Sequence, residues 1–128
     1  MIKFLRTAKI DSSKKVCLLR LDLNETDGWR LERSLTTIKW LLKKKKKILI
    51  LSHKGRPVKF ENSLSLKNNA SQLEKLIKRK IHFFGDFNFS EIKNLVDSSS
   101  PSSIFVLENL RFLPGEQKNS LELAKKLA

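Results

Sequence analysis

Four short apolar runs divide this chain, and the segments between them carry apolar residues at helical spacing. The runs are VCLLRLDL (16–23), KILILS (47–52), KIHFF (80–84) and IFVLEN (104–109). The first is nearly continuous, which is typical of a strand buried on both faces of a sheet. Because a strand can use only a few connections to reach the next parallel strand, this alternation limits the possible folds more than any other feature.

The intervening segments predict helices. Helical spacing is clearest at four positions that fall on one face, namely Leu31, Leu35, Ile38 and Leu42. Three more helices are expected: one after Ser65 as N-cap, a weaker one opened by Ser90, and a last one capped by Asn119. Their apolar positions are Leu66, Ala70, Leu73 and Ile77; Ile92, Leu95 and Val96; and Leu121, Ala124 and Leu127.

Alternating strands and helices predict an α/β fold: a Rossmann-like three-layer α-β-α domain with a mostly parallel sheet. The 128 residues are enough for one domain with a real core. No further strand follows the last expected helix, although a final crossover in a parallel sheet normally leads to one. We therefore expect the chain to be truncated before the end of its domain.

Composition excludes several classes of protein. Hydrophobic residues make up 40% and charged residues 31%, which favours a soluble globular domain, and no run approaches a membrane span. We find no signal peptide, and Cys17 is the single cysteine, which favours a reducing, cytoplasmic location and a core role. One cysteine and two separated histidines do not make a familiar zinc site, so no metal site is expected.

The net charge of +14 would attract anions of any kind, including nucleic acid. One dense run, Lys43–Lys47, falls where the first helix should end, and cations there suit the helix dipole. We therefore favour a solvated basic surface over a dedicated nucleic-acid patch. A basic module that binds RNA remains the alternative function, with a truncated product without function as a third.

Polar residues follow three of the four predicted strands. They are Asp22 and Asn24 after the first, SHKGRP (52–57) after the second, and Glu108, Asn109 and Arg111 after the fourth. Open parallel sheets bind ligands at the carboxyl ends of their strands, and arginine holds carboxylates and phosphates through paired hydrogen bonds. These residues predict a site for a small molecule with two anionic ends.

Each of these residues also has a purely structural interpretation. Asp22 and Asn24 could satisfy loop backbone, His53 could be a packed histidine, and Arg111 could form a structural ion pair. Their convergence on one edge favours a site. His82, Trp29 and Trp40 are interpreted as structural, and neither a GxGxxG nor a Walker phosphate loop is present.

The same segments resemble, in order, the amino-terminal domain of the phosphoglycerate kinase family. They are RLDLN (20–24), TIKWLL (37–42), ILILSHKGRP (48–57), SLSLKNNASQLEKLI (63–77) and VLENLRFLPGEQKN (106–119). The resemblance covers the chain from about Lys15 onward, and the combination of SH-x-GRP with ENLRF is its most specific part.

The resemblance implies a two-domain hinge enzyme of glycolysis, a phosphotransferase with a carboxyl-group acceptor. Such an enzyme moves a phosphoryl group between 1,3-bisphosphoglycerate and ADP, giving 3-phosphoglycerate and ATP. Residues 1–128 would be a partial amino-terminal, substrate-binding domain, and the nucleotide-binding domain, with its Mg-ATP or Mg-ADP, would be absent from this chain. The chain is expected to be monomeric and inactive alone, with no membrane or nucleic-acid partner.

The family's functional residues carry over by motif. Asp22 and Asn24 match its substrate-binding D-x-N, Arg111 matches the arginine of ENLRF, and Arg30 matches the catalytic arginine that stabilises the transferring phosphoryl group. The substrate loop corresponds to His53, Lys54, Gly55 and Arg56.

Three departures affect this correspondence. Arg30 follows Asn24 by only six positions, where the family has a longer hairpin, so Arg33 is the alternative catalytic arginine. Glu25 and Thr26 also stand where the family has Val-Pro, and Lys54 replaces a usual leucine.

Overall fold

A computed structural model describes residues 9–23, 29–116 and 118–128, apart from the side chain of Trp29. Its centre is a parallel sheet of four strands in the order β1-β2-β4-β3. The strands are β1 (Val16–Arg20), β2 (Lys47–Leu51), β3 (Ile81–Phe84) and β4 (Ile104–Leu107). The predicted α/β class with a parallel sheet is confirmed.

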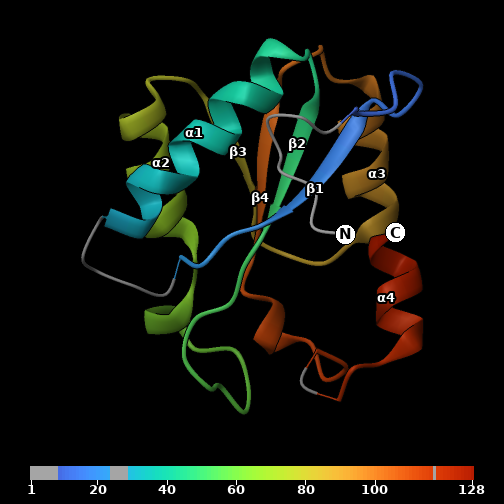
Figure 1. Ribbon diagram of the computed structural model, residues 1–128. Coiled ribbons are helices and arrows are strands. Elements are labelled where there is room, and N and C mark those ends of the chain that lie inside the picture. The colour runs from blue at the N-terminus through green and yellow to red at the C-terminus, as the bar shows by residue number, and fades with distance from the viewer. Residues whose placement is uncertain (1–8, 24–28, 117) are drawn as a thin grey trace, which may run out of the picture.

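Helices cover both faces of the sheet (Figure 1). Helices α1 (Trp29–Lys43) and α2 (Lys67–Ile77) lie on one face, and α3 (Phe89–Ser98) and α4 (Leu121–Leu127) on the other. Two short 3-10 helices, η2 (Asn62–Leu64) and η3 (Leu110–Phe112), lie in the loops after β2 and β4. Among the described residues, no helix is both long enough and apolar enough to cross a bilayer.

Side-chain alternation along the strands divides the core into two parts. In β2, Ile48 and Ile50 pack with α1 and α2, whereas Leu49 packs with α3 on the opposite face. The central strands β2 and β4 are therefore buried on both faces. Burial on both faces was predicted for the run at 16–23, and this prediction is wrong. The strand β1 ends at Arg20 and lies at the edge of the sheet, so that Leu18 is 43% exposed.

Three of the predicted helix caps differ by one or two residues. The N-cap of α2 is Leu66, although the Ser65 hydroxyl still accepts the Lys67 N–H. Asn88 rather than Ser90 caps α3, and Ser120 rather than Asn119 caps α4, because each has a side-chain oxygen placed to accept an N–H of the first turn. Two residues that were expected on the buried faces of these helices are exposed instead: Leu95 is 40% exposed and Leu121 is 70% exposed.

The lysine run is not uniformly solvated. Lys46 and Lys47 are buried, and the ammonium group of Lys47 donates to the carbonyl oxygens of Val96 and Asp97, both at 2.8 Å. These carbonyls belong to the last turn of α3, where no N–H of a following turn is available, and that of Val96 also accepts the N–H and the hydroxyl of Ser99. Lys46 likewise donates to the backbone oxygens of Asp11 and Lys14. The basic-surface interpretation is wrong for these two lysines.

The other residues expected to be structural have varied surroundings. Trp40 on α1 and Cys17 on β1 both pack, partly buried, against the same core cluster, and burial raises the pKa of the Cys17 thiol. His82 is exposed rather than enclosed, with its ring centroid 4.7 Å from that of Phe84.

Candidate functional site

The carboxyl ends of β1, β2 and β4 meet at one edge of the sheet, here called the carboxyl rim. The rim comprises Arg20 at the end of β1 and Asp22 after it, residues 52–57 after β2, residues 108–111 after β4, and the nearby Arg30 and Glu116. Asn24, Glu25 and Thr26 lie outside the described residues.

Buried polar groups join the strand ends beneath the rim. The hydroxyl oxygen of Ser52 accepts the Leu23 N–H at 3.1 Å, and the Ser52 carbonyl accepts the Leu110 N–H at 3.1 Å. Ser52 is fully buried, so neither bond competes with water. The backbones after β1, β2 and β4 are therefore held together by one residue.

Asn109 fixes the loop that contains the predicted substrate residues. Its amide nitrogen donates to the carbonyls of Lys54 (2.7 Å) and Leu64 (3.0 Å), and its oxygen accepts the Lys54 N–H at 3.1 Å. Asn109 is fully buried, which makes it a structural residue rather than a ligand contact. The ENLRF motif thus shapes the neighbouring SHKGRP loop.

Glu108 has a similar structural role. One of its oxygens accepts the N–H groups of Leu66 (2.8 Å) and Asn109 (2.7 Å), and the other accepts the Ser65 hydroxyl at 2.7 Å. Only 3% of Glu108 is exposed. The carboxylate therefore anchors the start of α2 to the end of β4 and is not available to a ligand.

Gly55 is required by the shape of the loop. Its φ of +63° lies in the left-handed region, and a Cβ there would come within 2.8 Å of the Leu64 side chain. The Gly55 carbonyl accepts a hydrogen bond of 2.6 Å from Nη1 of Arg111. The loop and the arginine are consequently fixed against each other.

A charged network crosses the rim. Nη2 of Arg20 lies 3.3 Å from Nδ1 of His53 and donates to Oε1 of Glu116 at 3.2 Å. The other oxygen of Glu116 lies 3.6 Å from Nε of Arg111. His53 and Arg111, both predicted from motifs, are thus brought to the same edge with two residues that the sequence reasoning missed.

The electrostatics of the rim favour a neutral His53 in the absence of ligand. Partial burial lowers the pKa of His53, and the positive charges of Arg111 and Arg20 lower it further, against the opposing charges of Glu116 and Asp22. A neutral ring can accept the Arg20 N–H at Nδ1. An arriving anion would shift this balance towards the protonated ring.

The predicted catalytic arginine also lies at the rim. Arg30, in the first turn of α1, donates to Oδ2 of Asp22 at 2.9 Å, and both side chains are nearly half exposed. Arg33 lies one helical turn further along α1. Lys54 is held through its backbone, and Arg56 is exposed, outside the network of Arg20, His53, Glu116 and Arg111.

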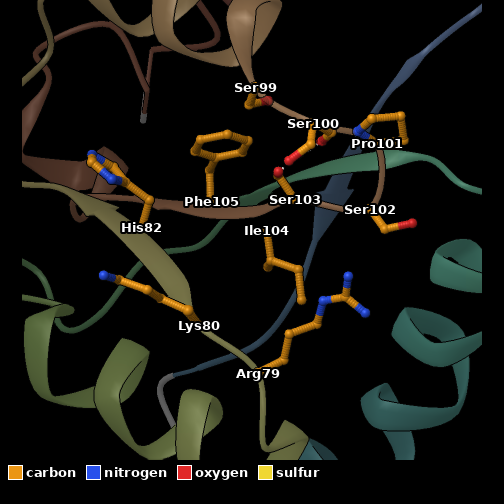
Figure 2. A pocket seen from close by; sticks show the side chains of 10 residues that line it. All are labelled: Arg79, Lys80, His82, Ser99, Ser100, Pro101, Ser102, Ser103, Ile104 and Phe105. Atoms are coloured by element: carbon orange, nitrogen blue, oxygen red, sulfur yellow. Dashed lines mark hydrogen bonds between the residues drawn. The ribbon is translucent and has the colours of Figure 1, made fainter.

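One hollow of the described surface lies elsewhere. Figure 2 shows a pocket of about 360 Å³ at the opposite, amino edge of the sheet, where Ser103, His82 and Phe105 surround the space. None of the predicted site residues lines it. Within the described residues, no group of three His, Cys, Asp or Glu side chains could hold a metal ion.

Comparison with known proteins identifies relatives along nearly the whole chain. The model of the family described as Phosphoglycerate kinase matches residues 7–128. The phosphoglycerate kinase of Helicobacter pylori strain J99 is 39% identical over 94% of this chain and 32% of its own length. That of a Wolbachia strain from Drosophila simulans is 38% identical over 92% of this chain and 31% of its own length.

Solved structures give the same result. Phosphoglycerate kinase from Coxiella burnetii matches with a TM-score of 0.72 and 31% identity, over 89% of this chain and 30% of that one. The enzyme from Pyrococcus horikoshii matches with a TM-score of 0.72 and 26% identity. The chain spans about a third of the length of the curated relatives it matches. These likenesses do not favour the nucleic-acid module.

Proposed function

The chain belongs to the phosphoglycerate kinase family, and from this premise we propose that its carboxyl rim is the 3-phosphoglycerate site of a phosphoglycerate kinase. The reaction is reversible phosphoryl transfer between 1,3-bisphosphoglycerate and ADP, which gives 3-phosphoglycerate and ATP. The observation that carries the proposal is the network that joins His53, Arg111 and the Gly55 loop at one edge. In glycolysis the protein would act in the cytoplasm, as a monomer.

The ligand has a carboxylate at one end and a phosphate at the other, and both suit this rim. Guanidinium groups bind such anions through paired hydrogen bonds, and Arg111 is only 25% exposed, which limits competition from water. We assign binding of 3-phosphoglycerate to Asp22, Asn24, Arg30, His53, Lys54, Gly55, Arg56 and Arg111. Asp22, being an acceptor, would orient a hydroxyl group or Arg30 rather than hold an anionic end.

Arg30 is proposed as the catalytic arginine. Phosphoryl transfer depends largely on positioning and on stabilising charge on the transferring group. Arg30 begins α1 beside Asp22, and the ion pair holds its guanidinium at the rim. A cation at that point can stabilise charge that develops on the phosphoryl oxygens.

The nucleotide and Mg²⁺ do not fit the described residues. The rim carboxylates are already engaged: Asp22 with Arg30, Glu116 with two arginines, and Glu108 with buried donors. No phosphate loop is present either. We therefore assign Mg-ATP and Mg-ADP to the part of the family's length that these 128 residues do not cover, and expect these residues alone not to catalyse transfer.

Isothermal titration calorimetry tests the ligand assignment. The protein is titrated with 3-phosphoglycerate, with glycerol 3-phosphate, which lacks the carboxylate, and with glycerate, which lacks the phosphate. A site for two anionic ends binds 3-phosphoglycerate at least about tenfold more tightly than either analogue, because each lost charged hydrogen bond costs about 1.5–3 kcal/mol. Equal affinity for all three, or for sulfate, would refute the assignment.

A further inference from the structure

Two arginines from distant parts of the chain meet a single carboxylate at the carboxyl rim. Arg20 ends β1 and Arg111 lies in η3, and each approaches a different oxygen of Glu116, at 3.2 Å and 3.6 Å. The side chain of Glu116 is only 12% exposed, whereas that of Arg20 is 60% exposed. Glu116 is therefore the enclosed centre of the network.

The arrangement of Arg111 depends on this carboxylate. Its Nη1 is held by the Gly55 carbonyl, but its Nε is buried and, among the described residues, makes no hydrogen bond. Glu116 supplies the neighbouring negative charge. Without it, two guanidinium groups would repel each other at short range, and the partly buried Arg111 would lose its counter-ion.

We propose that Glu116 is a positioning residue for the anion-binding rim, which holds Arg20 and Arg111 in the orientation that presents them beside His53 and Gly55. Its carboxylate would touch the arginines and not the substrate. The identity of the ligand rests on the proposed function, whereas the orientation of the arginines does not.

A positioning role and a simple counter-charge role for Glu116 predict opposite changes in anion affinity when its charge is removed. Replacing Glu116 with Gln makes the rim more positive by one charge, so a mere counter-charge would bind an anion more tightly after the change. A positioning residue gives the reverse result, because the arginines lose their orientation and with it their paired hydrogen bonds. The direction of the change in affinity therefore separates the two roles.

The experiment compares 3-phosphoglycerate affinity in the wild type, Glu116→Gln and Glu116→Asp. We expect about tenfold weaker binding in Glu116→Gln, from the loss of roughly one charged hydrogen bond, and a smaller loss in Glu116→Asp. The matched control is Glu122→Gln, which makes the same charge change at an exposed carboxylate paired with Lys126 on α4. Equal or tighter binding in Glu116→Gln would overturn the proposal.

A ligand-free measurement keeps the inference separate from the proposed function. NMR of the Arg111 Nε–H should show slow solvent exchange in the wild type and fast exchange in Glu116→Gln, while amide signals of β2 and β4 stay in place. If the wild type does not bind 3-phosphoglycerate but this change occurs, the proposed function fails and the positioning role stands. If the Arg111 Nε–H signal is unchanged, the positioning role is wrong.

Discussion

Arg111 donates a hydrogen bond of 2.6 Å from Nη1 to the carbonyl oxygen of Gly55, which precedes it by 56 residues in sequence. The bond joins the segment after β4 to the loop after β2, so the two motifs that identify the family form one structure. In this loop Gly55 has a backbone conformation that only glycine adopts readily.

Replacing Arg111 with lysine should weaken 3-phosphoglycerate binding by about ten- to a hundredfold, measured by calorimetry. Lysine keeps the charge but lacks the planar fork that can hold the Gly55 carbonyl and an anion together. The matched control is Arg79→Lys at the opposite edge of the sheet, which should bind as the wild type does. Normal affinity in Arg111→Lys would mean that only the charge of Arg111 matters.

Replacing Asn109 with alanine should destabilise the fold by about 2–4 kcal/mol, measured by urea unfolding. The change leaves the buried backbone groups of Lys54 and Leu64 without their hydrogen-bond partners, and each unsatisfied group costs about 1–3 kcal/mol. Asn94→Ala on the exposed face of α3 is the control and should change stability by less than about 1 kcal/mol. A small effect in Asn109→Ala would show that water replaces the lost bonds.

Lys47 should be more important for stability than any exposed lysine. Replacing it with methionine keeps most of the side-chain volume but removes the donor to the last turn of α3, at a cost of about 1–3 kcal/mol. Lys39→Met, on the exposed side of α1, is the control for the loss of one charge. Equal stability of the two variants in urea would mean that the buried ammonium group contributes nothing net.

His53 should make the protein less stable as the pH falls from neutral. Because burial and two arginines lower its pKa in the folded state, the unfolded chain takes up a proton first, at about pH 6.5. Stability therefore falls as the pH drops from the unfolded value to the lowered folded value, and the histidine contributes no further change below it. His53→Gln should remove this part of the pH dependence of urea midpoints, and an unchanged slope would contradict the prediction.

The sheet could be predicted from sequence because strands and helices differ in the period of their apolar residues. The runs at 47–52 and 104–109 became the buried central strands, whereas the run at 16–23 gave no sign that it would lie at an edge. Caps were misplaced by one or two positions because equally suitable cap residues, Asn88 and Ser120, lie within two residues of Ser90 and Asn119. Such choices depend on local geometry rather than residue type.

The residues of the candidate site differ in how clearly the sequence indicates their role. His53 and Arg111 stand in specific motifs. Arg20 could have been found because it lies two residues before Asp22, and side chains two apart on a strand point to the same side. Glu116 carried no signal, since its place depends on the path of the chain after η3. The polar groups Glu108 and Asn109 were expected at the rim, but they lie buried beneath it because the loop backbone needs them as partners.

The central claim, that the carboxyl rim binds 3-phosphoglycerate, is tested most directly by an NMR titration of the 15N-labelled protein. We predict that 3-phosphoglycerate shifts the resonances of Gly55, His53 and Arg111 in a saturable way, while those of Lys44 and Lys45 at the other edge move little. Shifts of the lysine resonances with Gly55 unmoved, and an equal response to sulfate, would contradict the account.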